Sequence, residues 1–112
     1  MRYLLDRLGM SSKYKGYRML LLALEIALRD EDNLTNIFQR IYTPVAERCG
    51  VTPVMVDKNL RSIIDIFWRS GNRELYRQIC GFQQTLCPTN AEFLEAVVAY
   101  TLRNGITTSP RV

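Results

Sequence analysis

The fold is decided by residues 45–60, which read VAERCGVTPVMVDKNL. Ala46 is small enough to let a second helix pack closely on the first, and Gly50 tolerates the positive φ of a tight turn. Thr52 supplies an N-cap hydroxyl, and Pro53 suits the first helical position because its missing N–H has no partner there. This order of residues predicts a short helix, a tight turn and a longer second helix, which together form a helix-turn-helix.

The second helix, predicted over residues 53–70, has two sides of different chemistry when successive residues are placed about 100° apart. One side is a continuous apolar stripe that faces the core; it comprises Val56, Leu60, Ile63 and Phe67, flanked by Ile64. The other side and its margins are mostly polar; they carry Val54, Met55, Asp57, Lys58, Arg61, Ser62, Asp65 and Arg69. An outward-facing first half is typical of a recognition helix, which meets base edges in the DNA major groove.

The chemistry of this outward face suits DNA bases. Arginine and lysine donate to O6 and N7 of guanine, and a carboxylate accepts from N4 of cytosine. We expect base contacts from Val54, Met55, Asp57, Lys58, Arg61 and Ser62, and phosphate contacts from Arg48, Thr52, Arg69 and Arg73. An alternative that the composition favours equally is a solvated face stabilised by the (i, i+4) pairs Asp57–Arg61 and Asp65–Arg69.

Outside this motif the sequence predicts further helices with short connections. Apolar residues recur at helical spacing between residues 14 and 29, and again at Leu34, Ile37, Phe38 and Ile41 after a capping Asn33. Thr89 and Glu92 form a capping box that opens the last helix. The other expected boundaries are a helix over 3–8 that ends at Gly9, an N-cap at Thr43 before Pro44, left-handed helix ends at Gly50 and Gly71, a helix from a capping Asn72 to Cys80, and a helix end at Gly105.

These signals predict an all-α protein of about six helices in a single compact domain. The domain is expected over residues 1–105, with residues 106–112 as a disordered tail. Strand signals are nearly absent, and only residues 81–87 are candidates for extended backbone.

Composition excludes several classes of function. The chain has 112 residues with 15 Lys and Arg, 11 Asp and Glu and no histidine, which gives a net charge of +4. The missing histidine excludes Ser-His and Cys-His nucleophile pairs and every His-ligated metal site. Cys49, Cys80 and Cys87 match neither a CxxC redox pair nor a zinc knuckle. We therefore expect no enzyme activity, no cofactor and no metal site.

The sequence carries no targeting or membrane signal. Residues 1–10 lack a long apolar segment and include Asp6. No run approaches the roughly 18 apolar residues of a membrane span. We expect a cytoplasmic protein without membrane contact, whose three cysteines are reduced and pack as small apolar side chains.

Several blocks of the sequence, in order, resemble one known family. They are Lys15-Gly16-Tyr17, Ile41-Tyr42-Thr43-Pro44-Val45-Ala46, Thr52-Pro53 with Val56, Trp68-Arg69-Ser70-Gly71-Asn72, and Pro88-Thr89-Asn90-Ala91-Glu92-Phe93. The chain is similar over nearly its whole length to the C-terminal effector domain of the stage-zero sporulation protein A family. The resemblance implies a six-helix domain that binds short promoter boxes in double-stranded DNA, usually as two copies side by side. It also implies a phosphoacceptor receiver domain upstream in a longer protein.

The resemblance carries over to the base-reading positions only in part. Arg61 aligns with an arginine of the family, Lys58 replaces another arginine and Asp57 replaces a glutamate. The remaining departures are Val54 for serine, Met55 for arginine and Ser62 for histidine. Since a bidentate arginine supplies about 1–3 kcal/mol of discrimination at one base pair, the target sequence stays open.

The sequence leaves two functions open. The first is a sequence-specific, promoter-binding transcription regulator of the sporulation response-regulator type. The second is a protein-interaction module that keeps the fold but has lost specific DNA recognition, which the apolar Val54 and Met55 favour. A homodimer is compatible with either function, with the last helix and residues 82–86 as candidate contacts.

Overall fold

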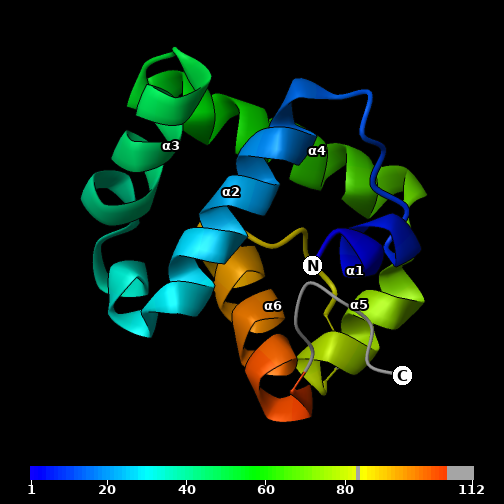
Figure 1. The fold of residues 1–112 in the computed structure, drawn as a ribbon. Coiled ribbons are helices and arrows are strands. Elements are labelled where there is room, and N and C mark those ends of the chain that lie inside the picture. Colours follow the sequence, from blue (N-terminus) through cyan, green and yellow to red (C-terminus); the bar gives the residue numbers. More distant parts are fainter. Residues whose placement is uncertain (83, 106–112) are drawn as a thin grey trace.

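Six α-helices and two short helical segments of different pitch form in the computed structural model, which describes residues 1–82 and 84–105. The elements are α1 (Arg2–Arg7), α2 (Lys15–Arg29), the 3₁₀-helix η1 (Glu31–Asn36), the π-helix η2 (Phe38–Tyr42), α3 (Thr43–Cys49), α4 (Pro53–Ser70), α5 (Arg73–Cys80) and α6 (Asn90–Asn104) (Figure 1). None of the described residues, including those of 81–87, is in a β-strand. The predicted all-α class is confirmed, and the expected tail at 106–112 lies outside the described residues.

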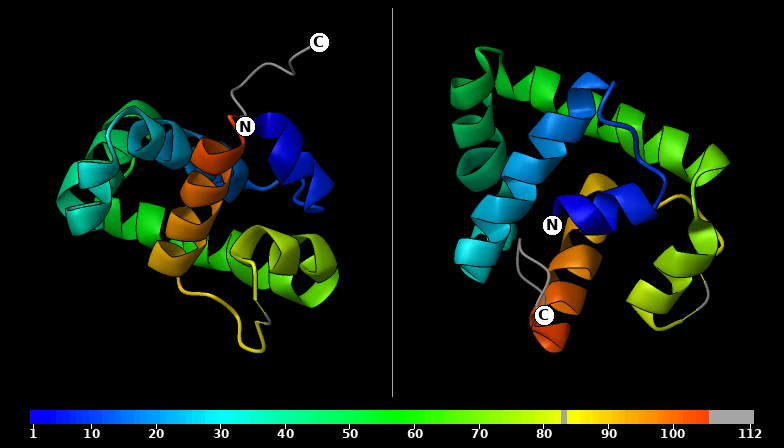
Figure 2. Two further views of the ribbon diagram at one scale, coloured as in Figure 1. Left: turned by 90° about the horizontal axis from the view of Figure 1, so that it is seen from below. Right: turned by 45° about the vertical axis from the view of Figure 1, so that its right-hand side comes forward.

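The core is built where α2 and α4 cross, with α6 packed against both (Figure 2). The predicted stripe of α4 is its inner side: Val56, Leu60, Ile63 and Phe67 are at most 2% exposed. The short α1 covers the junction between α4 and α5, since the N–H of Asn72 donates to the carbonyl of Leu8 at 2.8 Å. The opposite, polar side of α4 is thereby left at the surface.

Gly16 allows α2 to approach α4 closely. A Cβ at this position would lie 2.4 Å from the carbonyl oxygen of Asn59 and 3.1 Å from Cβ of Ile63. Since an α4 carbonyl cannot move without disturbing its helix, any larger residue here must push the two helices apart.

We therefore expect Gly16→Ala to lower the free energy of unfolding by about 1–3 kcal/mol, even though alanine favours helices. Urea denaturation checks this, with Lys15→Ala as the control because Lys15 is exposed on the same helical turn. Equal stability of the two variants would contradict the close contact.

Most predicted helix boundaries are confirmed. The Thr52 hydroxyl accepts from the N–H of Met55, and the Asn72 side chain accepts from the N–H of Leu75. Both halves of the capping box are present, because Thr89 accepts from the N–H of Glu92 and the Glu92 carboxylate accepts from the N–H of Thr89. The left-handed helix ends fall at Gly50 and Gly105, with φ of 70° and 63°.

The segment after α2 differs from the prediction of a helix capped by Asn33. Asp30 is the cap instead, accepting from the N–H of Asp32 at 3.0 Å, while the Asn33 side chain donates back to the carbonyl of Ile26. The chain then winds as 3₁₀ and next as π, so the spacing of its apolar residues departs from 3.6 per turn. As a result Ile41 is fully buried but Phe38 remains 45% exposed.

Thr43 is not the N-cap that its place before Pro44 predicts. It has helical backbone angles, and the helix runs through it without a break from η2. A proline inside a helix clashes with the carbonyl four residues earlier, and the wider π turn before Pro44 makes room for its ring. The Thr43 hydroxyl instead donates to the carbonyl of Phe38 at 3.1 Å.

The prediction of a left-handed helix end at Gly71 is wrong. The backbone there is extended, with φ −93° and ψ −166°. A Cβ here would lie 2.6 Å from the ring of Phe67 and 2.7 Å from the carbonyl oxygen of Leu8. Glycine is required by the close approach of Phe67 and of Leu8 rather than by its backbone angles.

The structure also bears on the cysteines and on membrane spans. Cys49, Cys80 and Cys87 are free thiols and partly buried. No helix among the described residues has the length and apolar content needed to cross a lipid bilayer.

Candidate nucleic-acid interface

The turn between α3 and α4 is closed by backbone hydrogen bonds to one residue. The N–H groups of Gly50 and Val51 both donate to the carbonyl of Ala46, the latter at 3.0 Å. Ala46 itself is 2% exposed, as expected for a small residue between two packed helices. This is the geometry that the sequence predicts for a helix-turn-helix, and it places the start of α4 at the surface.

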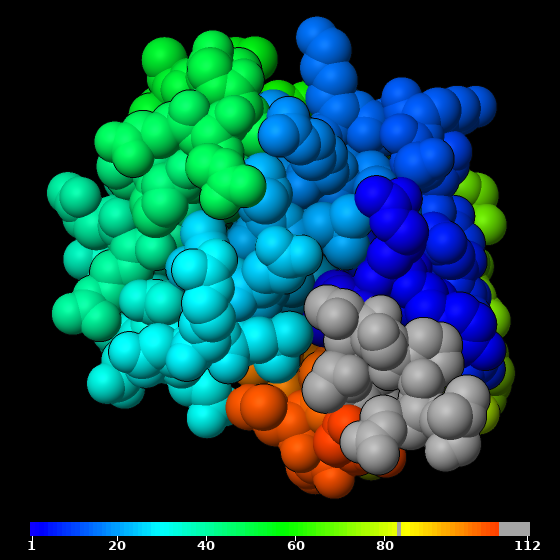
Figure 3. Space-filling model, viewed as in Figure 1, coloured from blue at the N-terminus to red at the C-terminus, as the bar shows by residue number. Residues whose placement is uncertain are grey.

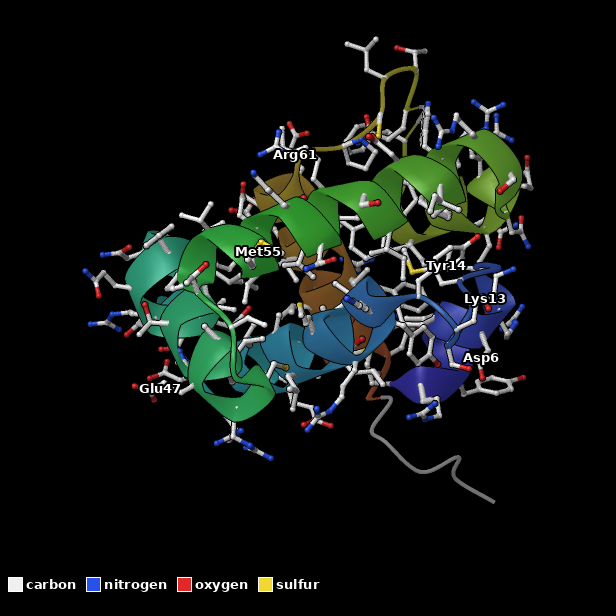
Figure 4. The ribbon with its side chains drawn as sticks, turned by 90° about the horizontal axis from the view of Figure 1, so that it is seen from above. Asp6, Lys13, Tyr14, Glu47, Met55 and Arg61 are labelled. Carbon is white, nitrogen blue, oxygen red and sulfur yellow. The ribbon has the colours of Figure 1, made fainter. Side chains whose placement is uncertain are left out.

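The first turns of α4 present their predicted side chains outward. Val54 and Met55 are 53% and 44% exposed, and the Arg61 side chain is 66% exposed. Lys58 and Ser62 are also exposed. Figure 4 labels Met55 and Arg61 on the first half of α4, with Arg61 on the side away from α2. These residues form the recognition face, which we define as Val54, Met55, Lys58, Arg61 and Ser62.

Arg61 is held in place on this face by Asp57, one helical turn earlier. Its guanidinium donates to Oδ2 of Asp57 at 3.0 Å, and this hydrogen bond raises the pKa of Arg61. The expected (i, i+4) pair is therefore present. The other expected pair, Asp65–Arg69, is not among the ion pairs of the described residues; Asp65 instead accepts from the thiol of Cys87 at 3.4 Å.

Asp57 is held in turn from the core side by Asn90, the first residue of α6. The Asn90 amide nitrogen donates to the carbonyl oxygen of Asp57 at 3.1 Å, to its Oδ1 at 3.2 Å and to the hydroxyl of Tyr42 at 3.0 Å. Asn90 is 8% exposed and Tyr42 2%, and burial raises the pKa of the Tyr42 hydroxyl. A buried amide thus connects η2, α4 and α6 directly behind the recognition face.

Sequence reasoning missed this role of Asn90. Its neighbour Thr89 already caps α6, so an amide at the next position had no assigned purpose. Asn90 and Tyr42 each lie in one of the blocks that carry the family resemblance, which is the only signal the sequence offers for their pairing.

The expected phosphate-binding residues lie in two separate places. Arg48 is exposed in the last turn of α3, and Thr52 caps α4 beside it. Arg69 lies in the last turn of α4, about 16 Å along the helix from Lys58 at 1.5 Å per residue. Arg73 begins α5 and stacks on the ring of Trp68, 5.0 Å from its centroid.

A helix-turn-helix whose second helix exposes cationic side chains can bind DNA, and comparison with known families identifies which kind it is. A family model described as sporulation initiation factor Spo0A C terminal matches residues 1–101. The chain belongs to this family. It is accordingly a DNA-binding regulatory domain of the sporulation response-regulator type, a class that acts in transcription regulation and not in catalysis.

Membership of the Spo0A C-terminal family gives the resembling blocks structural roles. The glycine of Lys15-Gly16-Tyr17 permits the contact between α2 and α4, and Gly71 permits the contact with α1. Asn90, in the block that opens α6, supports Asp57 on α4. Three of the five blocks therefore position α4 against another helix.

Proposed function

We propose that this Spo0A-type domain is a sequence-specific, promoter-binding transcription regulator that reads the DNA major groove with α4. The observation that carries the proposal is the recognition face itself. Its arginine is exposed toward solvent and is held at a defined angle by Asp57. Orienting a guanidinium in advance lowers the entropy cost of the bidentate contact that it makes with guanine.

The roles of the other residues follow from their places. Lys58 donates to a neighbouring base as a point charge, while Val54 and Met55 offer apolar contact to thymine methyl groups. Ser62 reaches a base edge or a water at the margin of the groove. Asp57 mainly positions Arg61, and its remaining lone pairs can accept from cytosine. Arg48 and Thr52 contact phosphates at one end of α4, and Arg69 and Arg73 do so at the other.

The test is selection of binding sites from random duplex DNA, followed by fluorescence anisotropy on the selected site and its single-base changes. Arg61→Ala should lose preference at one base pair, with discrimination falling by roughly 5- to 150-fold, equivalent to about 1–3 kcal/mol. Arg69→Ala is the matched control, because loss of a phosphate contact weakens binding to all sequences alike.

Two results would overturn the proposal. One is absence of duplex binding at 50 mM salt, where electrostatic attraction is strong. The other is an Arg61→Ala variant with the base preferences of the wild type. Either result would favour the alternative of a protein-interaction module, for which the exposed Val54 and Met55 provide an apolar contact.

Binding as two copies side by side is the second part of the proposal. It is supported by exposed apolar side chains on the loop after α5 and on α6: Phe82, Leu86 and Leu102 are 63%, 78% and 48% exposed. Sedimentation with DNA carrying one or two copies of the selected site distinguishes one bound domain from two.

A further inference from the structure

A second cationic surface lies where the chain enters α2. Lys13, Lys15 and Arg18 are exposed there, and we call these three residues the α2-entry patch. They border a hollow of about 440 Å³ whose other side is formed by Cys49 and Val51, at the turn of the helix-turn-helix. Figure 3 shows the segment that begins α2 standing out at the upper edge of the molecule, next to α3.

No carboxylate of the described residues forms an ion pair with the α2-entry patch. The ion pairs found among residues 1–82 and 84–105 are Arg61–Asp57 and Arg77–Glu74. No acidic residue lines the hollow. Asp6, which Figure 4 labels on α1, accepts a hydrogen bond from the Tyr17 hydroxyl at 2.6 Å. Three positive charges thus face solvent beside the turn.

The patch lies along one flank of α4. Gly16, between Lys15 and Arg18, packs on the carbonyl of Asn59 and on Ile63, which fixes the start of α2 beside the middle of α4. Asn59 and Met55 share that flank, since the Asn59 amide donates to the Met55 carbonyl at 2.9 Å. Figure 4 shows the segment of Lys13 and Tyr14 on the α2 side of α4.

Groove dimensions determine what meets this flank. The major groove is about 12 Å wide and a helix with its side chains is about 10–12 Å across. When α4 lies in the groove, the phosphates of the two strands must therefore run directly along its flanks. Asp57 lies on one flank, where Asn90 supports it from the core side, and the α2-entry patch occupies the other.

We infer that the α2-entry patch binds the phosphate backbone of one DNA strand while α4 reads the bases. The inference rests on the proposed function and adds a binding site outside the helix-turn-helix. Phosphate contacts of this kind set the register and angle of the recognition helix without reading sequence. The close contact at Gly16 makes the patch and α4 one rigid unit, so a phosphate held by the patch sets the depth of α4 in the groove.

The test compares the salt dependence of binding to the selected duplex and to a scrambled duplex. Lys13→Gln/Lys15→Gln/Arg18→Gln should reduce the slope of log K against log salt by about 2–3, since each lost phosphate contact removes roughly 0.9. The loss should be the same on both duplexes. Lys13→Gln alone, in an exposed segment, should reduce the slope by about 0.9.

The control variant is Arg2→Gln/Arg7→Gln/Arg29→Gln. It has the same net charge as the patch variant but lacks three cations from other places. These residues lie on α1 and at the far end of α2, and we expect a change of slope below about 1. Equal slopes for the two triple variants would overturn the inference but leave the proposed function intact if Arg61→Ala still loses its base preference. Absence of duplex binding by the wild type would overturn both.

Discussion

Phe67→Ala is expected to lower the free energy of unfolding by about 3–5 kcal/mol, a large part of the total for a domain of this size. Phe67 is 1% exposed. Its ring meets those of Tyr76 and Phe93 edge to face, with centroids 5.5 and 5.7 Å apart. Because these partners belong to α5 and α6, one side chain joins three helices. Urea denaturation monitored by circular dichroism measures the loss.

Phe38→Ala is the matched control. Phe38 is 45% exposed and makes one edge contact, with Tyr42 at 5.8 Å. Its removal leaves no closed cavity, so we expect a loss below about 1 kcal/mol. If both variants lost the same stability, the aromatic cluster under α4 would not be the joint that the packing indicates.

The side of α4 that is buried could be predicted from sequence because one physical rule determines it. A stripe at 3.6-residue spacing has only one way to face a core, and the four residues of the stripe are indeed buried. The caps at Thr52, Asn72 and Thr89 were predictable for a similar reason, since each satisfies backbone groups of its own helix. Such local interactions are encoded within four residues.

The errors fall where tertiary packing or a change of helical pitch decides the local structure. Gly71 is expected to be left-handed because glycine usually ends helices so, yet a glycine is needed there because Phe67 and Leu8 both lie against it. At Thr43 the preceding helix continues through the expected cap, and a π turn accommodates Pro44. The periodicity of apolar residues predicts neither effect. The first depends on tertiary packing and the second on a change of helical pitch.

The candidate site shows the same division. The Asp57–Arg61 pair follows from (i, i+4) spacing and was expected from sequence. The hydrogen bond from Asn90 that supports this pair was not expected, because 33 residues separate Asn90 from Asp57. In the sequence the α2-entry patch is only three cationic residues near the N-terminus, and its place beside α4 depends on the contact at Gly16.

Asn90→Asp should be the most damaging conservative change at the interface, lowering the free energy of unfolding at pH 7 by about 3 kcal/mol. It replaces the amide donor by a carboxylate that faces Oδ1 and the carbonyl of Asp57. The side chain at this position is buried, since Asn90 is only 8% exposed. Two carboxylates at hydrogen-bond distance repel, and the buried one is poorly solvated. Asn90→Ala removes the same hydrogen bonds without adding charge, and should lose only about 1–2 kcal/mol.

The pH dependence separates the charge effect from the loss of packing. Burial and the neighbouring carboxylate raise the pKa of the introduced carboxyl group in the folded state above its unfolded value. The variant is therefore penalised most above the folded pKa, and the penalty shrinks as pH falls through that value because the neutral acid is favoured in the fold. The difference in unfolding free energy between Asn90→Asp and Asn90→Ala should accordingly narrow from pH 7 toward pH 4.

The exchanged pair Asp57→Asn/Asn90→Asp supplies the decisive comparison. It restores one amide facing one carboxylate, so it should be more stable than Asn90→Asp alone, whereas independent effects would simply add. It also removes the carboxylate that holds Arg61. We therefore expect the double variant to recover stability but not the preference at the base pair that Arg61 reads. Recovery of both would mean that Asp57 does not position Arg61, and additive destabilisation would mean that Asn90 and Asp57 do not interact.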